Sequence, residues 1–267
     1  MASHPRAQDL ASLPVDELAL WVLRLMLSSK PATFVRSHFL GQVLKNVGER
    51  MPGDSVYRQR AEASAQPPHL GRALAEAWGW LVAEGLIAEA ATAMLAGQMP
   101  LEGYFFVTRF GERVAAHPRA REWIAAERRL GLVLHPRLEE RARRQFILGE
   151  FEAAALVSMR EVEIAVRERS GLPVTTLGSD LMNKAFAEAG PLTDAAAPKA
   201  EQEGLRALYR GAISVFKNPA SHRRLSYDDP VEAAEIVLFA DLLLRMVDPV
   251  EPIADAPNQS ADASAGA

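Results

Sequence analysis

The segment FKNPASHRR, residues 216–224, places three residue types close together that can act on a phosphodiester. Lys217 supplies a positive charge, Asn218 an amide, and His222 an imidazole five positions after the lysine. Cleaving RNA without a metal requires a base for the ribose 2′-hydroxyl, an acid for the leaving 5′-oxygen, and donors that stabilise the charged phosphorane. His222 is the only histidine after His135, so no other side chain there ordinarily changes charge near neutral pH. Lys217, Asn218 and His222 are therefore the candidate catalytic residues.

A histidine that caps a helix end is the commoner explanation of this spacing when it is considered alone. Pro219 disfavours the α conformation at Asn218, so the preceding helix is predicted to stop there. A new short turn can then start and carry Ser221 and His222. This bend would let His222 return toward Lys217.

Three further residues are predicted to contact the substrate. Arg210 lies two helical turns before Lys217, on the same polar face of the predicted helix. Ser221 and Arg223 flank His222. We expect them to add a hydroxyl and a second positive charge beside the phosphate.

The composition excludes several classes of protein. Hydrophobic residues make up 49% of the 267 residues, enough for a real core in one large or two ordinary domains. The chain has no cysteine, which excludes disulfides and thiolate metal sites and fits a cytoplasmic protein. The most apolar segment, 233–247, contains three charged residues and predicts a buried helix, not a membrane span. The formal charge of −4 excludes a uniformly basic nucleic-acid binder. We expect no cofactor and no metal.

Breaks at proline and glycine clusters divide a mainly α chain into two domains with flanking segments. The predicted parts are a disordered N-terminus at 1–11, a winged-helix-like domain at 12–117, an arginine-rich connecting helix at 118–147, a helical domain at 148–248 and a disordered tail at 249–267. The connecting segment has eight arginines against four acids, which fits either a solvated helix or a basic rim that attracts RNA.

The winged-helix pattern is visible in the order of elements within 12–117. Helices are predicted near 14–28, 33–47 and 69–84, followed by short strands in EGLIAE and GYFFVT and a wing at 95–103. Gly85 is predicted to end the third helix in the left-handed conformation. Arg72 is the one arginine of that helix, and residues 1–117 have eleven basic and eleven acidic residues. A contact with DNA through Arg72 and a contact with a protein partner both remain open, and the neutral charge favours the protein.

Four helical segments are predicted in 148–248. The first pairs Glu163 with Arg167, ends at Gly171 and buries one stripe of residues, namely Ala155, Met159, Val162 and Val166. A shorter helix covers 179–188. The third, 201–218, is predicted to have as apolar positions Leu205, Leu208, Ala212, Val215 and Phe216. The fourth begins with Asp229 as the cap, followed by Pro230.

Long stretches of this half resemble a known family. The segments are EVEIAVRERSG, SDLMNKAFAEAGPLTD, LYRGAISVFKNPASHR and DDPVEAAEIVLFADLLLRMVD, and they are similar to the C-terminal domain of the bacterial Ymh-type hypothetical protein family, which is grouped with the HEPN superfamily. The resemblance covers roughly 135–248, and the region from AWGWLVAEGLI to YFFVTRFGERV resembles the winged-helix module that often precedes this domain. It implies an antiparallel helical bundle that pairs as a dimer.

The resemblance also implies a basic residue, a polar residue and a histidine that form a metal-independent ribonuclease centre across the dimer interface of active relatives. The matching positions are Lys217, Asn218 and His222. The superfamily prefers arginine at the first position, and lysine keeps the charge but loses the bidentate contact to phosphate.

Together the residues and the resemblance predict an endoribonuclease that acts on RNA as a homodimer, of a toxin or antiphage-defence type. Two alternatives are a non-catalytic DNA-binding regulator that uses Arg72 and is dimerised by the bundle, and a module that binds RNA without cutting it. No membrane partner is expected.

Overall fold

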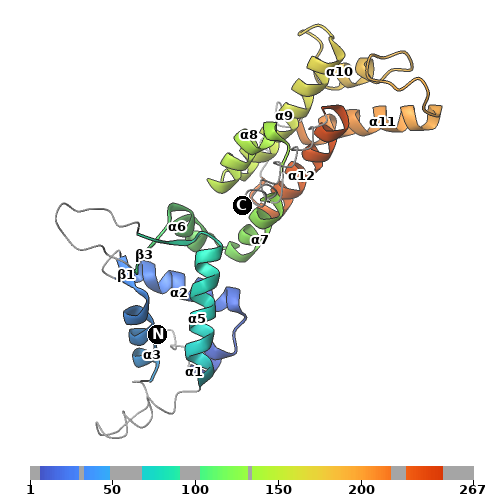
Figure 1. Cartoon of the computed structure of the whole chain (residues 1–267). Helices are drawn as coiled ribbons and strands as arrows, with labels where there is room; N and C mark the ends of the chain where they lie inside the picture. Colours follow the sequence, from blue (N-terminus) through green and yellow to red (C-terminus); the bar gives the residue numbers. More distant parts are fainter. Residues whose placement is uncertain are drawn as a thin grey trace, which may run out of the picture. The chain divides into compact units, whose positions relative to one another are not determined.

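The structure is a computed structural model, and it describes residues 7–29, 33–48, 68–90, 103–131, 134–217 and 227–248. The chain forms two compact units. The N-terminal unit is Met1–Arg129 with Ile147–Gly149, and the C-terminal unit is Leu130–Phe146 with Glu150–Ala267. Helices dominate both units, so the prediction of a mainly α chain is confirmed (Figure 1).

The N-terminal unit combines helices with one small sheet. Its elements are α1 (Ala7–Ala11), α2 (Val15–Ser28), β1 (Thr33–Val35), α3 (Arg36–Gly48), α5 (Pro68–Ala83), β2 (Ile87–Glu89), β3 (Tyr104–Val107), α6 (Arg109–Ala116) and α7 (Ala120–Leu130), which ends at the unit boundary. The strand order is β1-β3-β2, and β3 pairs antiparallel with both neighbours. The three predicted helices and the two predicted strands are present.

The core of this unit lies between α2, α5 and the sheet. Trp78 on α5 is buried, and its ring meets Phe105 edge-on with centroids 5.1 Å apart and Phe39 at 6.0 Å. Gly85 adopts a φ of +66° after α5, and the next residue, Leu86, donates its N–H to the carbonyl of Leu81 at 2.9 Å. This hydrogen bond satisfies a carbonyl that the helix end would leave free, so the predicted end at Gly85 is confirmed.

Two predictions at the start of the chain need correction. Residues 7–11, assigned to a disordered terminus, form α1 because Leu10 is buried and packs toward α5. Residues 33–35, assigned to a helix, form β1 because Phe34 is buried and pairs with Phe105 across the sheet. Both corrections depend on contacts with distant residues, which local composition does not show. Residues 1–6 and residues 95–102 of the predicted wing lie outside the described residues.

The predicted single helix over 118–147 is instead two helices, α7 and α8 (Pro136–Ile147). Pro136 occupies the first position of α8, where its missing N–H costs no hydrogen bond. The carbonyl of His135 accepts from the N–H of Leu138 at 2.8 Å and so starts the new helix. The boundary between the two units falls inside this segment, after Arg129.

The C-terminal unit is a set of packed helices. After α8 come α9 (Phe151–Ser170), α10 (Gly178–Ala185), α11 (Lys199–Ala212), the π-helical turn η1 (Ile213–Lys217) and α12 (Pro230–Val247). The most extensive contact between two helices is that of α9 with α12 (Figure 1). The stripe predicted on α9 is buried throughout. In the part of the chain that the structure describes, no helix has the length and apolar character needed to cross a bilayer.

The helices of this unit end or begin where the sequence predicts, whereas the buried face of α11 and η1 differs from the predicted one. Gly171 ends α9 with a φ of +65°, and Asp229 caps α12 by accepting the N–H of Val231 at 2.9 Å. On α11 and η1, however, Leu208 and Val215 are exposed. The side that faces the core carries Ala212, as predicted, and also Tyr209 and Ile213, which were not predicted there. Tyr209 lies on α11 before the π-helical turn begins at Ile213, so the difference at Leu208 reflects the buried ring of Tyr209, which was not among the predicted apolar positions. The predicted disordered tail at 249–267 lies outside the described residues.

Candidate functional site

The structure describes one of the three candidate catalytic residues. Lys217 is the last residue of η1, and Asn218 and His222 lie in the following segment, 218–226, outside the described residues. Ser221 and Arg223 lie there as well. The described part of the site is therefore the surroundings of Lys217.

Lys217 is held by a buried carboxylate from another helix. Its Nζ lies 2.6 Å from Oε2 of Glu163 on α9. The Glu163 side chain is 4% exposed and the Lys217 side chain 27% exposed, so the ammonium sits at the edge of the packed interior. An ion pair at this depth is poorly screened by solvent and fixes the position of the lysine.

Glu163 has two further donors, both on its other oxygen. Arg167, one turn later on α9, donates from a guanidinium nitrogen to Oε1 at 3.0 Å. The backbone N–H of Gly178 at the start of α10 donates to the same oxygen at 2.8 Å. We call Glu163, Arg167, Lys217 and the Gly178 N–H the Glu163 cluster. It joins α9, α10 and η1 around one carboxylate.

The charges of the Glu163 cluster do not cancel. Burial alone would raise the pKa of Glu163, but the hydrogen bonds from Lys217 and Gly178 and the charges of Lys217 and Arg167 outweigh it and lower that pKa. Glu163 is therefore ionised at neutral pH. Two cations share one anion, which leaves a net charge of +1. An ammonium has three donors, and Glu163 uses one of those of Lys217, so an anion can bind the others.

The π-helical turn places Lys217 and a serine beside the start of α10. Ser214, within η1, shares a hydrogen bond of 2.9 Å with the hydroxyl of Ser179, the residue after Gly178. The ring of Phe216 packs on Phe239 of α12 with centroids 6.0 Å apart, which holds the turn against the core. Such π-turns are frequent at functional sites, because the extra residue changes the direction of the side chains that follow.

The other predicted contact residues do not join the Glu163 cluster. Arg210 is exposed on α11 and makes no ion pair with any residue that the structure describes. Arg72 is exposed on α5, in the other unit, with Glu76 one turn later.

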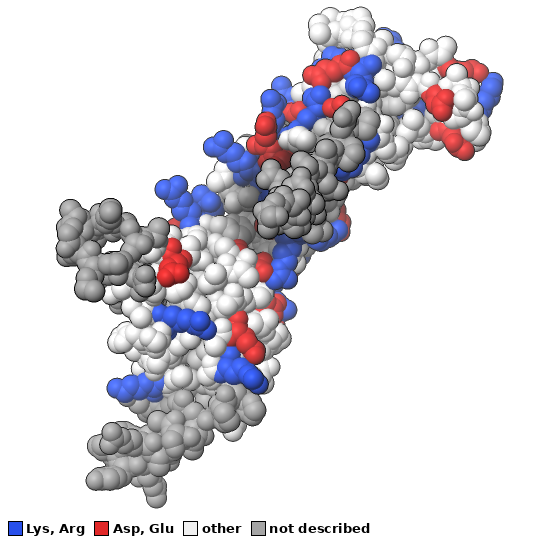
Figure 2. All heavy atoms as spheres, viewed as in Figure 1, with Lys and Arg blue, Asp and Glu red and all other residues white. Residues whose placement is uncertain are grey.

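The basic rim proposed for 118–147 is largely neutralised by ion pairs. Within the C-terminal unit, Arg137 pairs with Glu168 at 2.7 Å and Asp248 at 2.9 Å, and Arg141 pairs with Glu161 at 2.9 Å. Positive and negative side chains are mixed over the visible face of both units (Figure 2). Exposed pairs of this kind add little stability, but they remove the uncompensated charge that RNA would need.

The role of Glu163 as the partner of Lys217 was not predicted from the sequence. The predicted pair between Glu163 and Arg167 is confirmed at 3.0 Å, but the spacing of residues within one helix cannot reveal a partner on another helix. One available signal was the position of Glu163 directly after Val162 in the buried stripe, where an acid requires a partner. Among the described residues, no group of three or more histidine or acidic side chains is placed to hold a metal ion.

Comparison with known proteins gives one match. No curated protein and no solved structure matches the chain. Residues 132–247, which contain α8 to α12 and the Glu163 cluster, match the family model described as "Protein of unknown function (Hypoth_ymh)", and the predicted similarity to the Ymh-type family is confirmed over this segment.

Proposed function

We propose that this chain is a metal-independent endoribonuclease of HEPN type that serves as a toxin or antiviral-defence effector. The observation that supports it is the position of Lys217, which was selected from the sequence as the cation for the phosphate. It is held 2.6 Å from a buried carboxylate, with Arg167 as a second cation. The lysine directly precedes the segment that carries Asn218 and His222.

Burying the charges of the Glu163 cluster costs free energy on folding. Because apolar residues would avoid this cost, the charges are more readily explained by a functional role. Removing a carboxylate from water requires several kcal/mol before its partners compensate, and apolar residues of similar size would fill the space as well or better. What the ion cluster provides, and an apolar cluster would not, is a fixed ammonium at the edge of the core with a net positive charge nearby. A phosphate in transition to a phosphorane gains negative charge and is stabilised by such a preorganised cation.

In the proposed reaction, the imidazole of one His222 accepts the proton of the ribose 2′-hydroxyl. The 2′-oxygen attacks phosphorus, the bond from phosphorus to the 5′-oxygen breaks, and the leaving oxygen takes a proton from an acid. The products are a 2′,3′-cyclic phosphate and a 5′-hydroxyl. Lys217 stabilises the negative charge of the phosphorane, and Asn218 donates a hydrogen bond to phosphate or orients His222.

The base and the acid are two separate groups, and each chain supplies one His222, so the proposal includes a homodimer. An exposed apolar surface supports it. The surface, here called the α11–α12 face, consists of Leu208, Val215 and Leu242, which are 38%, 57% and 53% exposed. The two helices lie against each other, since the hydroxyl of Tyr209 donates to the carbonyl of Leu243 at 2.6 Å. Clustered exposed apolar side chains are typical of interaction surfaces.

Replacing Leu242 by aspartate should convert the dimer to a monomer and lower RNA cleavage with it, because the charge would be buried unpaired at the interface. Light scattering coupled to size-exclusion chromatography measures the mass. Val174→Asp is the matched control, since Val174 is 79% exposed in the same unit but outside the α11–α12 face. A wild-type monomer, or an unchanged mass of Leu242→Asp, would contradict this interface.

The N-terminal unit is proposed to be a winged helix that contacts protein, not DNA. The order of α2, β1, α3, α5, β2 and β3 and the central position of β3 support the winged-helix interpretation. Its third helix, α5, has one arginine, Arg72, while Gly71 and Gly79 contribute no side chain to the exposed face. A single cation gives little affinity for phosphates, which need several on one face.

The reaction is tested with an RNA oligonucleotide and matched oligonucleotides that carry one 2′-deoxynucleotide at each mapped cleavage position. In EDTA, wild-type protein should cut the RNA, leave cyclic phosphate ends, and fail at any position whose 2′-hydroxyl is missing, because that oxygen is the nucleophile. DNA should stay intact. Cleavage that requires magnesium, or that continues at the deoxy position, would exclude the proposed chemistry. RNA that binds but stays uncut would favour the RNA-binding alternative.

A further inference from the structure

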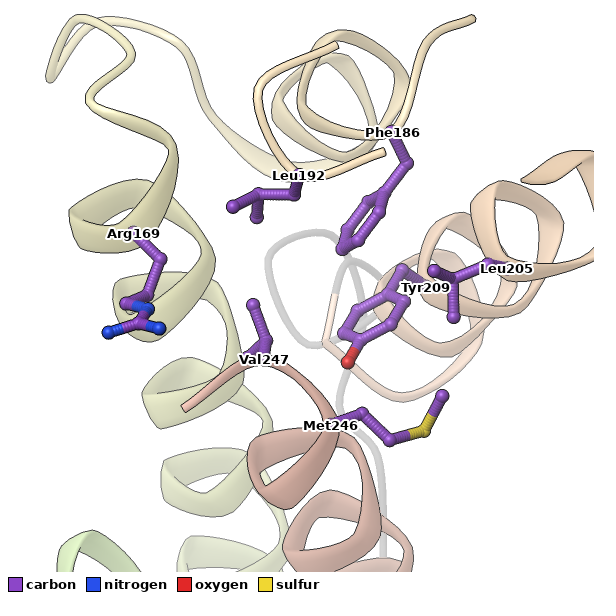
Figure 3. Close-up of a pocket in the computed structure, with 7 residues that line it drawn as sticks. All are labelled: Arg169, Phe186, Leu192, Leu205, Tyr209, Met246 and Val247. Atoms are coloured by element: carbon purple, nitrogen blue, oxygen red, sulfur yellow. The ribbon is translucent and has the colours of Figure 1, made fainter. Parts of the chain in front are cut away.

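A small pocket in the C-terminal unit has no part in the proposed reaction. It opens between the end of α9, the loop after α10, α11 and the end of α12, and it shares no residue with the Glu163 cluster. Figure 3 shows the rings of Phe186 and Tyr209 on one side and Arg169 on the other, with Leu192 and Val247 between them. Its volume is about 140 Å³.

The lining of the pocket is mixed in polarity, and its apolar part includes an aromatic stack. The rings of Phe186 and Tyr209 are 4.4 Å apart with an angle of 22° between their planes. The hydroxyl of Tyr209 donates to the carbonyl of Leu243 at 2.6 Å, so Tyr209 offers its ring to the pocket and not a free polar group. An aromatic or flat apolar ligand is therefore favoured over a polar one.

Arg169 is the single charged side chain of the pocket lining. It makes no hydrogen bond or ion pair with any residue that the structure describes, and no acidic residue lines the pocket. This arginine contrasts with Arg137 and Arg141 of the same unit, which are both paired. A guanidinium presents parallel N–H donors that match the two oxygens of a carboxylate, so the pocket favours a ligand with an acid group.

The volume limits the size of the ligand. An apolar cavity of about 150 Å³ in another protein binds benzene, so about 140 Å³ holds one six-membered ring. The exposed position of Arg169 places the charged group of the ligand at the rim, where it keeps part of its hydration.

We propose that this pocket binds a monocyclic aromatic carboxylate. Its ring lies between Leu192, Val247 and the stacked rings of Phe186 and Tyr209, and its carboxylate pairs with Arg169. Tyr209 belongs to α11, which continues into η1 and Lys217, so the ligand contacts the same helix that carries the proposed catalytic lysine. The binding proposal itself does not depend on ribonuclease activity.

The test uses phenylacetate as the probe and the full chain as the protein. Saturation-transfer NMR should show ring protons of phenylacetate in contact with the protein, with a dissociation constant roughly in the millimolar range for a ligand of this size. The neutral analogue 2-phenylethanol should bind about fivefold more weakly than phenylacetate. Arg169→Met should lower the affinity for phenylacetate by a similar factor and leave the affinity for the alcohol unchanged. Leu192→Trp, which fills the pocket, should abolish binding of both.

The matched control for charge is Arg160→Met, an exposed arginine on α9 that does not line the pocket and should leave binding unchanged. The melting temperature of each variant shows whether it folds. If Leu192→Trp does not fold, Leu192→Phe is used instead, because its smaller side chain fills the pocket with less strain. Absence of saturation transfer at 10 mM probe, roughly ten times the expected constant, overturns the proposal. So does transfer that persists in the filled variants, or equal affinity for the acid and the alcohol.

Discussion

Replacing His222 by alanine should lower the rate of RNA cleavage by at least the factor of about 10² to 10⁴ that one general acid–base residue contributes. The loss should be largest of all single substitutions, because each active site of the proposed dimer loses both its base and its acid. Cleavage of a fluorescent RNA oligonucleotide in EDTA measures the rate, with wild type and variant purified side by side. The expected variant binds RNA as wild type does and leaves it uncut.

The control must address contamination as well as folding. Common contaminating ribonucleases also work without a metal and leave cyclic phosphates, so a preparation of a catalytically inactive variant is the reference for background. His38→Ala is the matched control, since His38 is exposed on α3, shares a hydrogen bond of 2.9 Å with Gln42, and lies in the other unit. It should cut as wild type does. Equal rates for wild type and His222→Ala would show that His222 is a structural cap and that the proposed mechanism is wrong.

The helix ends were the most predictable part of the fold, because each depends on residues adjacent in sequence. Gly85 and Gly171 adopt the left-handed conformation that glycine tolerates, and Asp229 caps α12 with its own side chain. Buried stripes were predicted nearly as well on α9. Each of these features depends on residues within about one helical turn of one another, so neighbouring positions in the sequence are enough to predict it.

Predictions failed where a distant contact or an irregular backbone decided the structure. β1 exists because β3 provides a partner strand, and α1 because α5 provides a surface for Leu10. On α11 the core-facing side carries the ring of Tyr209, which the predicted set of apolar positions did not include. In the candidate site, chemistry and spacing selected Lys217, yet the acid that positions it comes from α9 and could not be identified from the lysine's own neighbours.

Replacing Glu163 by glutamine should both destabilise the protein and lower RNA cleavage, because Lys217 and Arg167 would lose the anion that holds them together. Breaking a buried pair costs 3–5 kcal/mol, and the partial exposure of Lys217 reduces this to about 2 kcal/mol. Denaturant unfolding at pH 7 measures the stability. The rate should fall roughly tenfold, and the removal of the charge in Lys217→Met should lower it about 10²- to 10³-fold.

Acidification should lower the stability of the protein through the protonation of Glu163. The pKa of Glu163 is lowered below its ordinary value of 4.5, so the folded state binds the proton less tightly than the unfolded state. The stabilisation by the ionised carboxylate is therefore fully present above pH 4.5 and is lost as the pH falls through the lower folded value. Glu163→Gln lacks this carboxylate, so its stability should approach that of wild type on acidification.

Glu161→Gln separates a positioning role from a structural one. Glu161 lies on the same helix, its side chain is 5% exposed, and it pairs with Arg141 at 2.9 Å outside the Glu163 cluster. Its replacement should destabilise the protein in the same manner and leave the rate unchanged below the melting temperature. In a Lys217→Met background, Glu163→Gln should cause no further loss of rate, because the carboxylate acts through the lysine. If the two losses multiply, or if Glu161→Gln slows cleavage equally, the buried carboxylate stabilises the fold and does not position Lys217.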